Sequence, residues 1–213
     1  MTATPPTTVD PVPSGSVGPQ HHAPARSPIR TVGRWMISFL GFPLGGWLAV
    51  TVAGPVDSVA AALAGGLITG IVLGAVQAWA LARLLHRPVA WTAGTGVGLA
   101  VGLTLGSLMV DYATGRSALL LQGAVTGGVV GLAQAVVLRP RLQTVSLLWP
   151  VILAATWALG WLISGLVIAD SVEQQFVVFG SSGAIAVTAL TSFLPLLLAR
   201  PGPDATLTAK SSS

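Results

Sequence analysis

The stretch GLITGIVLGAVQ at residues 66–77 recurs fifty-seven residues later as GAVTGGVVGLAQ at residues 123–134. Both copies follow the pattern G-x3-G-x3-G-x2-Q. Glycine at every fourth residue leaves a groove along one helix face, and in an apolar run that groove is where another membrane helix can approach closely. We therefore expect a fold built from repeats that pack through small residues. The predicted packing residues of these two copies are Gly66, Gly70, Gly74, Gly123, Gly127 and Gly131.

The composition indicates an integral membrane protein. Of the 213 residues 53% are hydrophobic and only 8% are charged, and the mean hydropathy is +0.81. Soluble domains carry about 25% charged residues. The net charge of +4 comes from ten basic residues that are scattered along the chain, which argues against nucleic acid as a partner. The absence of cysteine excludes disulfides and thiolate metal sites.

Six apolar runs, each of about the length that a spanning helix needs, follow one another from residue 34 onward. They lie at about 34–54, 58–82, 89–110, 117–138, 145–169 and 176–199. The sequence therefore predicts an all-α protein with six transmembrane helices in one domain, residues 34–200. The flanking segments 1–33 and 201–213 are expected to be disordered tails, since the first is rich in proline and polar residues. We expect no secretory signal before Trp35, because no apolar core precedes it.

The basic residues predict the orientation in the membrane, because cytoplasmic segments retain Lys and Arg. When alternate segments are counted, nine of the ten basic residues fall on one side and only Arg116 on the other. Both termini are then cytoplasmic. An excess of Arg over Lys with abundant Ala, Gly and Val is typical of a GC-rich bacterium, so the expected location is a bacterial cell membrane.

The odd-numbered runs repeat as well. Trp35, Trp91 and Trp149 each stand eleven residues before a glycine, at Gly46, Gly102 and Gly160. A third copy of the even-numbered pattern begins at Gly180, with Ala184, Thr188 and Thr191 where the other copies have Gly, Gly and Gln. The predicted fold is therefore three parallel two-helix repeats about a pseudo-threefold axis. We interpret the three tryptophans as anchors at the membrane interface, where an indole can bury its ring and hydrogen-bond at head-group level.

Two polar sets stand out against the apolar background. Gln77, Gln134 and, at the equivalent place, Thr191 are predicted to lie in the polar interior of the bundle, where they bond to neighbouring helices or line a constriction. Asp57, Asp111 and Asp170 form an outer acidic set at corresponding places in the repeats. These carboxylates either keep tight loops solvated or ring an outer vestibule that attracts cations.

The residue types argue against an enzyme. The three histidines fall outside the apolar runs, and no Asp or Glu lies well inside a run, so general acid-base chemistry has no residues in the membrane. We expect no cofactor, no metal and no catalytic residue.

Two roles are consistent with this composition. The first is a non-enzymatic multi-pass protein whose glycine faces bind other membrane helices, its own or those of a partner or second copy, in the lipid bilayer. The alternative is a small passive transporter or channel along the pseudo-threefold axis, lined by Thr69, Gln77, Thr126, Gln134, Thr188 and Thr191.

The pattern of three hairpins resembles a set of uncharacterised bacterial multi-pass membrane proteins. The resemblance rests on Trp and Gly on the first helix of each hairpin and on G-x3-G-x3-G-x2-Q followed by Leu and Arg on the second, and it covers residues 34–200. In that set the glutamine is typically followed by Trp, whereas Ala78 and Ala135 follow it here. The resemblance implies the membrane fold and no activity.

The topology can be tested by cysteine labelling, because the chain has no cysteine of its own. Single cysteines that replace Ser58, Thr114 or Ser171 should react with an impermeant reagent added to intact cells. A cysteine that replaces Ser14 should react only after the cells are opened. Labelling of Ser14→Cys in intact cells would contradict cytoplasmic termini.

Overall fold

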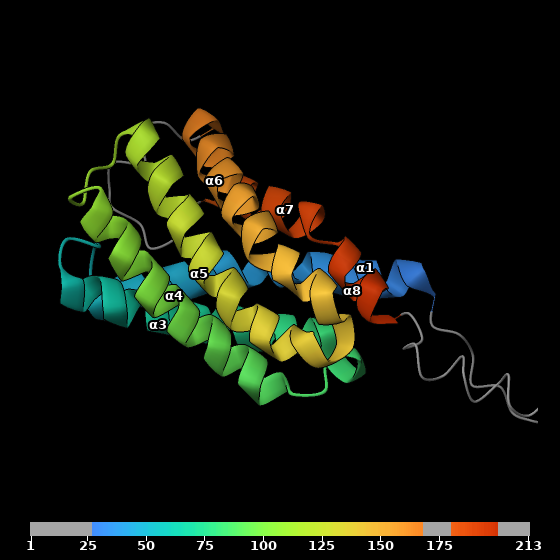
Figure 1. The fold of residues 1–213 in the computed structure, drawn as a ribbon. Helices are drawn as coiled ribbons and strands as arrows, with labels where there is room; N and C mark the ends of the chain where they lie inside the picture. Colours follow the sequence, from blue (N-terminus) through green and yellow to red (C-terminus); the bar gives the residue numbers. More distant parts are fainter. Residues whose placement is uncertain (1–26, 168–179, 200–213) are drawn as a thin grey trace, which may run out of the picture.

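The computed structural model describes residues 27–167 and 180–199, apart from the side chain of Arg83. These residues form helices and no strands, which confirms the all-helical prediction (Figure 1). In chain order the elements are α1 (Pro28–Ile37), η1 (Ser38–Leu40), α2 (Gly41–Ala53), α3 (Val59–Leu81), η2 (Ala82–Leu84), α4 (Pro88–Met109), α5 (Arg116–Leu142), η3 (Gln143–Leu148), α6 (Trp149–Val167), α7 (Ser181–Leu190) and α8 (Phe193–Ala199).

Five helical stretches are long and apolar enough to span a membrane. They are Pro28–Ala53, Val59–Leu81, Pro88–Met109, Arg116–Val167 and Ser181–Ala199. The fourth stretch is 52 residues long and contains both α5 and α6, which are joined by η3 and lie side by side in Figure 1. These lengths and this composition suggest a membrane protein.

Several helix boundaries differ from the sequence prediction, and two of these differences involve proline. α1 begins at Pro28, so residues 28–33, which were expected in the disordered tail, are helical. Proline is well tolerated in the first helical turn because its missing N–H has no intrahelical partner there, and its fixed φ suits the helix. α5 continues through Pro140 to Leu142, beyond the predicted end at residue 138. Arg139 and Arg141 lie in this last turn, where positive charge favours the helix end.

Prolines explain the two interrupted helices. Pro43 follows the 3-10 segment η1, and Pro195 follows a turn at Thr191 and Ser192 that separates α7 from α8. A proline inside a helix removes one i→i−4 hydrogen bond, and its ring clashes with the carbonyl four residues earlier. The carbonyls affected belong to Phe39, inside η1, and to Thr191, at the turn.

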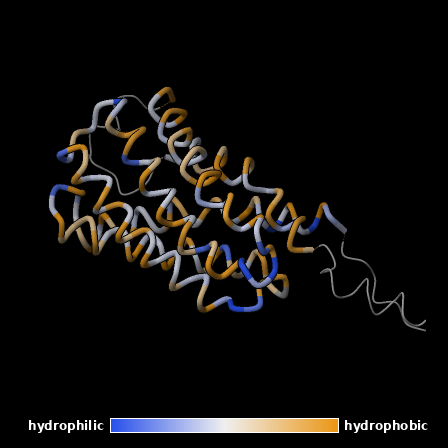
Figure 2. The backbone as a smooth tube through the Cα atoms, in the orientation of Figure 1, coloured by the Kyte–Doolittle hydropathy of each residue, from blue (hydrophilic) through white to orange (hydrophobic). Residues whose placement is uncertain are grey.

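Large apolar side chains cover the outside of the bundle. Trp47, Val101, Leu132 and Val151 are examples from four different helices, each at least 40% exposed. Figure 2 shows apolar residues along the lengths of the helices, with the hydrophilic ones gathered toward the two ends. Soluble proteins rarely expose apolar patches of this extent. We define the basic end as the end that carries the α3–α4 and α5–α6 connections, with Arg87, Arg139 and Arg141.

The glycine pattern of α3 lies against α4 with almost no space between the backbones. A β-carbon added at Gly70 would lie 2.6 Å from the carbonyl oxygen of Thr95 and 2.7 Å from Cα of Gly96. At Gly66 and Gly74, the nearest atoms would be the α-carbons of Ala100 at 2.7 Å and Thr92 at 2.9 Å. Only a residue without a side chain fits at these positions, so the repeated glycines set the α3–α4 distance.

The glycine pattern of α5 lies against α6 in the same way. An added β-carbon at Gly131 would lie 2.5 Å from Cα of Pro150, and one at Gly127 would lie 2.7 Å from Cβ of Trp157. A β-carbon at Gly123 would lie 2.5 Å from Cδ1 of Trp161. The second copy of the motif therefore repeats the contact of the first, one helix pair further along the chain.

Small residues also meet within each expected hairpin. An added β-carbon on Gly45 would meet Thr69, one on Gly102 would meet Thr126, and one on Gly183 would meet the carbonyl of Gly160. In the first hairpin the contact residue is Gly45, and Gly46, which the sequence spacing indicated, is only half-buried. The reason is the 3-10 segment η1, which lies between Trp35 and these glycines. A 3-10 turn takes about 3.0 residues where an α-helical turn takes about 3.6, so the residue on the face of Trp35 comes one position earlier, at Gly45.

The first and last helical segments are neighbours. α1 and α2 contact α3 on one side and α7 on the other, and α1 also contacts α8. Neighbouring helices along the chain contact each other as well, from α3 to α7. The contacts therefore run around the bundle and return to the start (Figure 1).

Two adjacent glycines of α5 give a matched test of this packing. Gly127 has no room for a methyl group, whereas an added β-carbon on Gly128 would meet only Cβ of Ala154, at an ordinary 3.7 Å. Gly127→Ala should lower the free energy of unfolding by about 1–3 kcal/mol through overpacking. Gly128→Ala should leave it unchanged or raise it, since alanine favours a helix more than glycine does. Thermal unfolding in detergent measures both, and equal melting temperatures for the two variants would contradict a closed α5–α6 contact at Gly127.

Candidate functional site

Three buried tryptophans donate hydrogen bonds to the helix that precedes them around the bundle. Nε1 of Trp91 in α4 donates to Oε1 of Gln77 in α3 at 3.2 Å, and Nε1 of Trp149 in α6 donates to Oε1 of Gln134 in α5 at 2.8 Å. Trp35 in α1 donates to Oγ1 of Thr191 at 3.2 Å and to the carbonyl of Thr188 at 3.1 Å. We call these three contacts the indole pairs. The third joins residues 156 positions apart and connects the two ends of the described chain.

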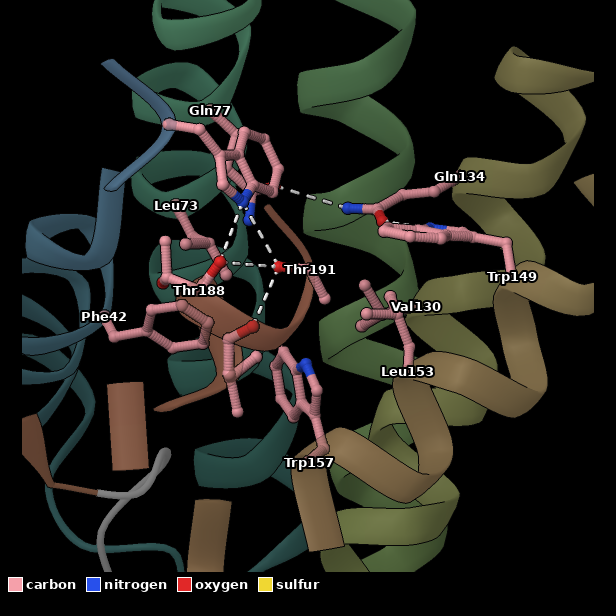
Figure 3. Close-up of a pocket in the computed structure, with 12 residues that line it drawn as sticks. Phe42, Leu73, Gln77, Val130, Gln134, Trp149, Leu153, Trp157, Thr188 and Thr191 are labelled. Atoms are coloured by element: carbon pink, nitrogen blue, oxygen red, sulfur yellow. Dashed lines mark hydrogen bonds between the residues drawn. The ribbon is translucent and has the colours of Figure 1, made fainter. Parts of the chain in front are cut away.

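Gln134 connects two of the three indole pairs, those of Trp91 and Trp149. Its amide nitrogen donates to Oγ1 of Thr95 in α4 at 2.9 Å and to Oε1 of Gln77 in α3 at 3.4 Å, while its oxygen accepts from Trp149. Only 2% of Gln134 is exposed, so these bonds are made away from solvent. One amide thus bridges α3, α4, α5 and α6, and Figure 3 shows it beside Trp149.

The acceptors and the apolar layer next to them recur at a spacing of fifty-seven residues. Gln77, Gln134 and Thr191 stand at this spacing, and so do Leu73, Val130 and Val187. All six line the same small cavity, together with Trp35, Phe42, Trp149, Leu153, Trp157 and Thr188 (Figure 3). Residues at equivalent places in the three sequence copies therefore meet around one point.

Side chains fill the space around this point. The cavity has a volume of about 10 Å³, near the lower limit for one water molecule. Phe42 and Trp157 close it on one side, with ring centroids 5.7 Å apart. Thr188, which the alternative role placed along an open path, bonds through its hydroxyl to the carbonyl of Ala184 at 2.8 Å. Thr69 and Thr126 likewise donate to backbone carbonyls.

The structure corrects the interpretation of the tryptophans as interface anchors. Trp35, Trp91 and Trp149 are 2%, 0% and 4% exposed, and their N–H groups bond inside the bundle. The signal for this position is in the sequence spacing. Eleven residues make about three α-helical turns, so a tryptophan shares a face with the glycine eleven residues later. Gly102 and Gly160 are buried against α5 and α7, which places the indoles on the inner face as well.

Trp79 is a different tryptophan at the basic end, one that the sequence analysis did not single out. It is 54% exposed, and the guanidinium carbon of Arg34 lies 4.8 Å from its ring centroid. Arg34 also donates to the carbonyl of Trp79 in the last turn of α3. The spacing could have indicated this position, because residues two apart on a helix point in nearly opposite directions. Gln77 points inward, so Trp79 points outward.

The remaining predicted residues lie apart from the indole pairs. Gly180 is the N-cap of α7 and precedes the helix, whereas Gly66 and Gly123 lie inside theirs. Asp57 and Asp111 are exposed at the end opposite the basic end, and Asp111 has a positive φ of 50° in the turn after α4. Asp170 lies outside the described residues.

The chain has been compared with protein-family models, with curated proteins and with solved structures, and none of them matches.

The chemistry that this cluster offers is neutral hydrogen bonding. Amide, hydroxyl and indole groups are the polar groups around the cavity, and none of them ionises near neutral pH. In an apolar interior such groups stabilise the fold only while every member keeps its partner. The cluster therefore acts as a set of helix connections, with Gln134 as its most connected member.

A double-mutant cycle tests the connection between Gln134 and Trp149. Gln134→Leu removes an acceptor for Trp149 and a donor to Thr95, and an unpaired buried donor costs about 1–3 kcal/mol. Combined with Trp149→Phe, it should show a coupling energy of about 0.5–2 kcal/mol in thermal or denaturant unfolding.

Thr191→Val and Trp79→Phe serve as controls for this cycle. Thr191→Val should cost less than Gln134→Leu, because Trp35 keeps the carbonyl of Thr188 as a second acceptor. Trp79→Phe, at an exposed site, should show no coupling to Gln134→Leu. Strictly additive effects of Gln134→Leu and Trp149→Phe would contradict the bond.

Proposed function

We propose that this chain is a non-enzymatic multi-pass protein of a bacterial cell membrane, with six spanning segments arranged as three two-helix repeats. The segments are α1–α2, α3, α4, α5, α6 and α7–α8. The contact between α1 and the C-terminal helices and the three equivalent indole pairs support a pseudo-threefold arrangement. Termini on the cytoplasmic side follow from the basic residues, which would place the basic end at the inner leaflet.

The proposal that the bundle does not conduct solute rests on the small volume that side chains leave around the proposed pseudo-threefold axis. A passive path would need a continuous polar lining wide enough for solute, whereas the cavity that Gln134 and Trp157 line among the described residues has a volume of about 10 Å³. The equivalent apolar residues Leu73, Val130 and Val187 lie directly beside the polar ones. We therefore propose a non-conducting bundle whose inner polar groups hold helices together.

The glycine faces belong to the same structural role. Each of the six glycines of the two complete motifs faces another helix of its own chain, at distances that leave no room for a partner helix. The glycines therefore serve assembly within the chain. A partner or second copy would bind at the apolar outer surface or at the ends. Apart from tryptophan, the buried polar side chains of the described residues are serine, threonine and glutamine, which supports a role without acid-base chemistry.

Flux through purified protein in liposomes tests the non-conducting role. Liposomes with the unmodified protein should take up glycerol at the rate of empty liposomes, measured by light scattering after an osmotic step. The double variant Gln77→Leu/Gln134→Leu should give the same rate, and it should only lower the melting temperature, since hydrogen bonds in lipid contribute about 0.6 kcal/mol each on average.

The alternative role as a channel predicts the opposite result for the unmodified protein and the double variant. Glycerol uptake by the unmodified protein that disappears in the double variant, with the amount of folded protein unchanged, would replace the non-conducting proposal. Circular dichroism and gel filtration of the protein recovered from the liposomes supply that check.

A further inference from the structure

A second, larger cavity opens at the basic end of the bundle. Its volume is about 180 Å³, and it lies between the α3–α4 connection, the last turns of α5 and the end of α8. Its walls are mostly apolar, from Leu84, Leu85, Val137, Leu138, Pro140 and Leu198. Three basic residues complete the lining, His86, Arg87 and Arg141. We call this cavity the basic pocket.

The charges of the basic pocket are all of one sign. Neither Asp nor Glu of the described residues lines it. Nη2 of Arg141 donates to the carbonyl of Leu198 at 3.0 Å, which holds this guanidinium at the rim, and a guanidinium has five donors, so others remain for a ligand. Arg87 is exposed and is the residue before α4, whose N-terminus adds a partial positive charge. The electrostatic preference is therefore for an anion.

The apolar walls determine which anion fits. A free phosphate ion gains nothing from leucine and valine side chains, whereas the glycerol part of a phospholipid can cover them. The volume of about 180 Å³ is smaller than the roughly 300–1,000 Å³ of pockets that enclose drug-sized ligands. The pocket can hold a head group, with the acyl chains lying outside along the apolar surface of the helices.

We propose that the basic pocket binds the phosphate head group of an anionic phospholipid of the inner leaflet, with Arg87 and Arg141 as its cationic contacts. The inference rests on the proposed membrane insertion and orientation, which bring this end to the head-group layer. Basic pockets between helices on the cytoplasmic side are a recurrent means of binding anionic lipid.

Arg87→Gln and Arg139→Gln form a matched pair for the test. Both remove one positive charge at the same end, and both arginines are exposed, but Arg139 does not line the pocket. Arg87 is preferred over Arg141 because its side chain makes no bond to α8. The full-length protein is reconstituted in nanodiscs of phosphatidylcholine with phosphatidylglycerol, and the lipid that remains bound after extraction is counted by native mass spectrometry.

The unmodified protein and Arg139→Gln should retain phosphatidylglycerol in preference to phosphatidylcholine. Arg87→Gln should retain about five-fold less, the factor that corresponds to about 1 kcal/mol for one basic residue near a membrane surface. Equal loss in both variants, or loss in neither, would overturn the proposal.

The free ion and the lipid are distinguished in detergent. Addition of phosphatidylglycerol to delipidated protein should raise the melting temperature of the unmodified chain and of Arg139→Gln, and less that of Arg87→Gln. Inorganic phosphate at the same concentration should have no such effect, and an equal rise with phosphate would identify a free anion as the occupant. Protein that is absent from the membrane fraction of cells would refute membrane insertion itself, whereas membrane-embedded protein that retains no phosphatidylglycerol would refute only the lipid site.

Discussion

The structure depends on close backbone contact at glycines. In water, apolar helices are driven together by the removal of their surface from solvent. Lipid offers no such drive, so in the membrane location that we propose, packing and hydrogen bonds would have to hold the helices together. The α-carbons of α4 come so near to Gly66, Gly70 and Gly74 that one methyl group would not fit. Because α5 meets α6 in the same manner, the distance between neighbouring helices is fixed at two equivalent places.

The indole pairs follow from this proximity. An indole N–H buried in an apolar interior must find an acceptor, since an unpaired polar group there has a high free-energy cost. Gln77 and Gln134 stand one turn or less beyond the last glycine of their motifs, so they reach the tryptophans of the helices that the glycines bring near. The third copy has Thr191 where the others have a glutamine. There the indole N–H of Trp35 donates to the hydroxyl of Thr191 and to the carbonyl of Thr188. In this copy the helix is also interrupted, by the turn between α7 and α8 that precedes Pro195.

The small inner cavity and the basic pocket, both lined by described residues, differ in the chemistry that they offer. The inner one is almost filled, has only neutral polar groups, and lies where residues of the three copies meet. The outer one is about 180 Å³, has cationic residues at its rim, and is formed by the α3–α4 connection and the ends of α5 and α8. The inner cavity is therefore closed by residues from the middle of the bundle, whereas the basic pocket is open at its basic end.

The sequence by itself determined the helical class, the approximate limits of the apolar segments and the inward position of the glycines, because these follow from hydropathy and from residue size along a single helix. The partners of the tryptophans were not readable from it. An indole at a helix end can reach head groups or a neighbouring amide, and the distance to the next helix, a tertiary quantity, decides between them. Pro140 and η1 are two further cases. Whether a helix ends at a proline or continues through it depends on the neighbouring segments. So does the rotation by which the 3-10 turn brings Gly45 into contact with α3. Only the tertiary structure could decide these points, since each one balances a local backbone preference against contacts with residues distant in the chain.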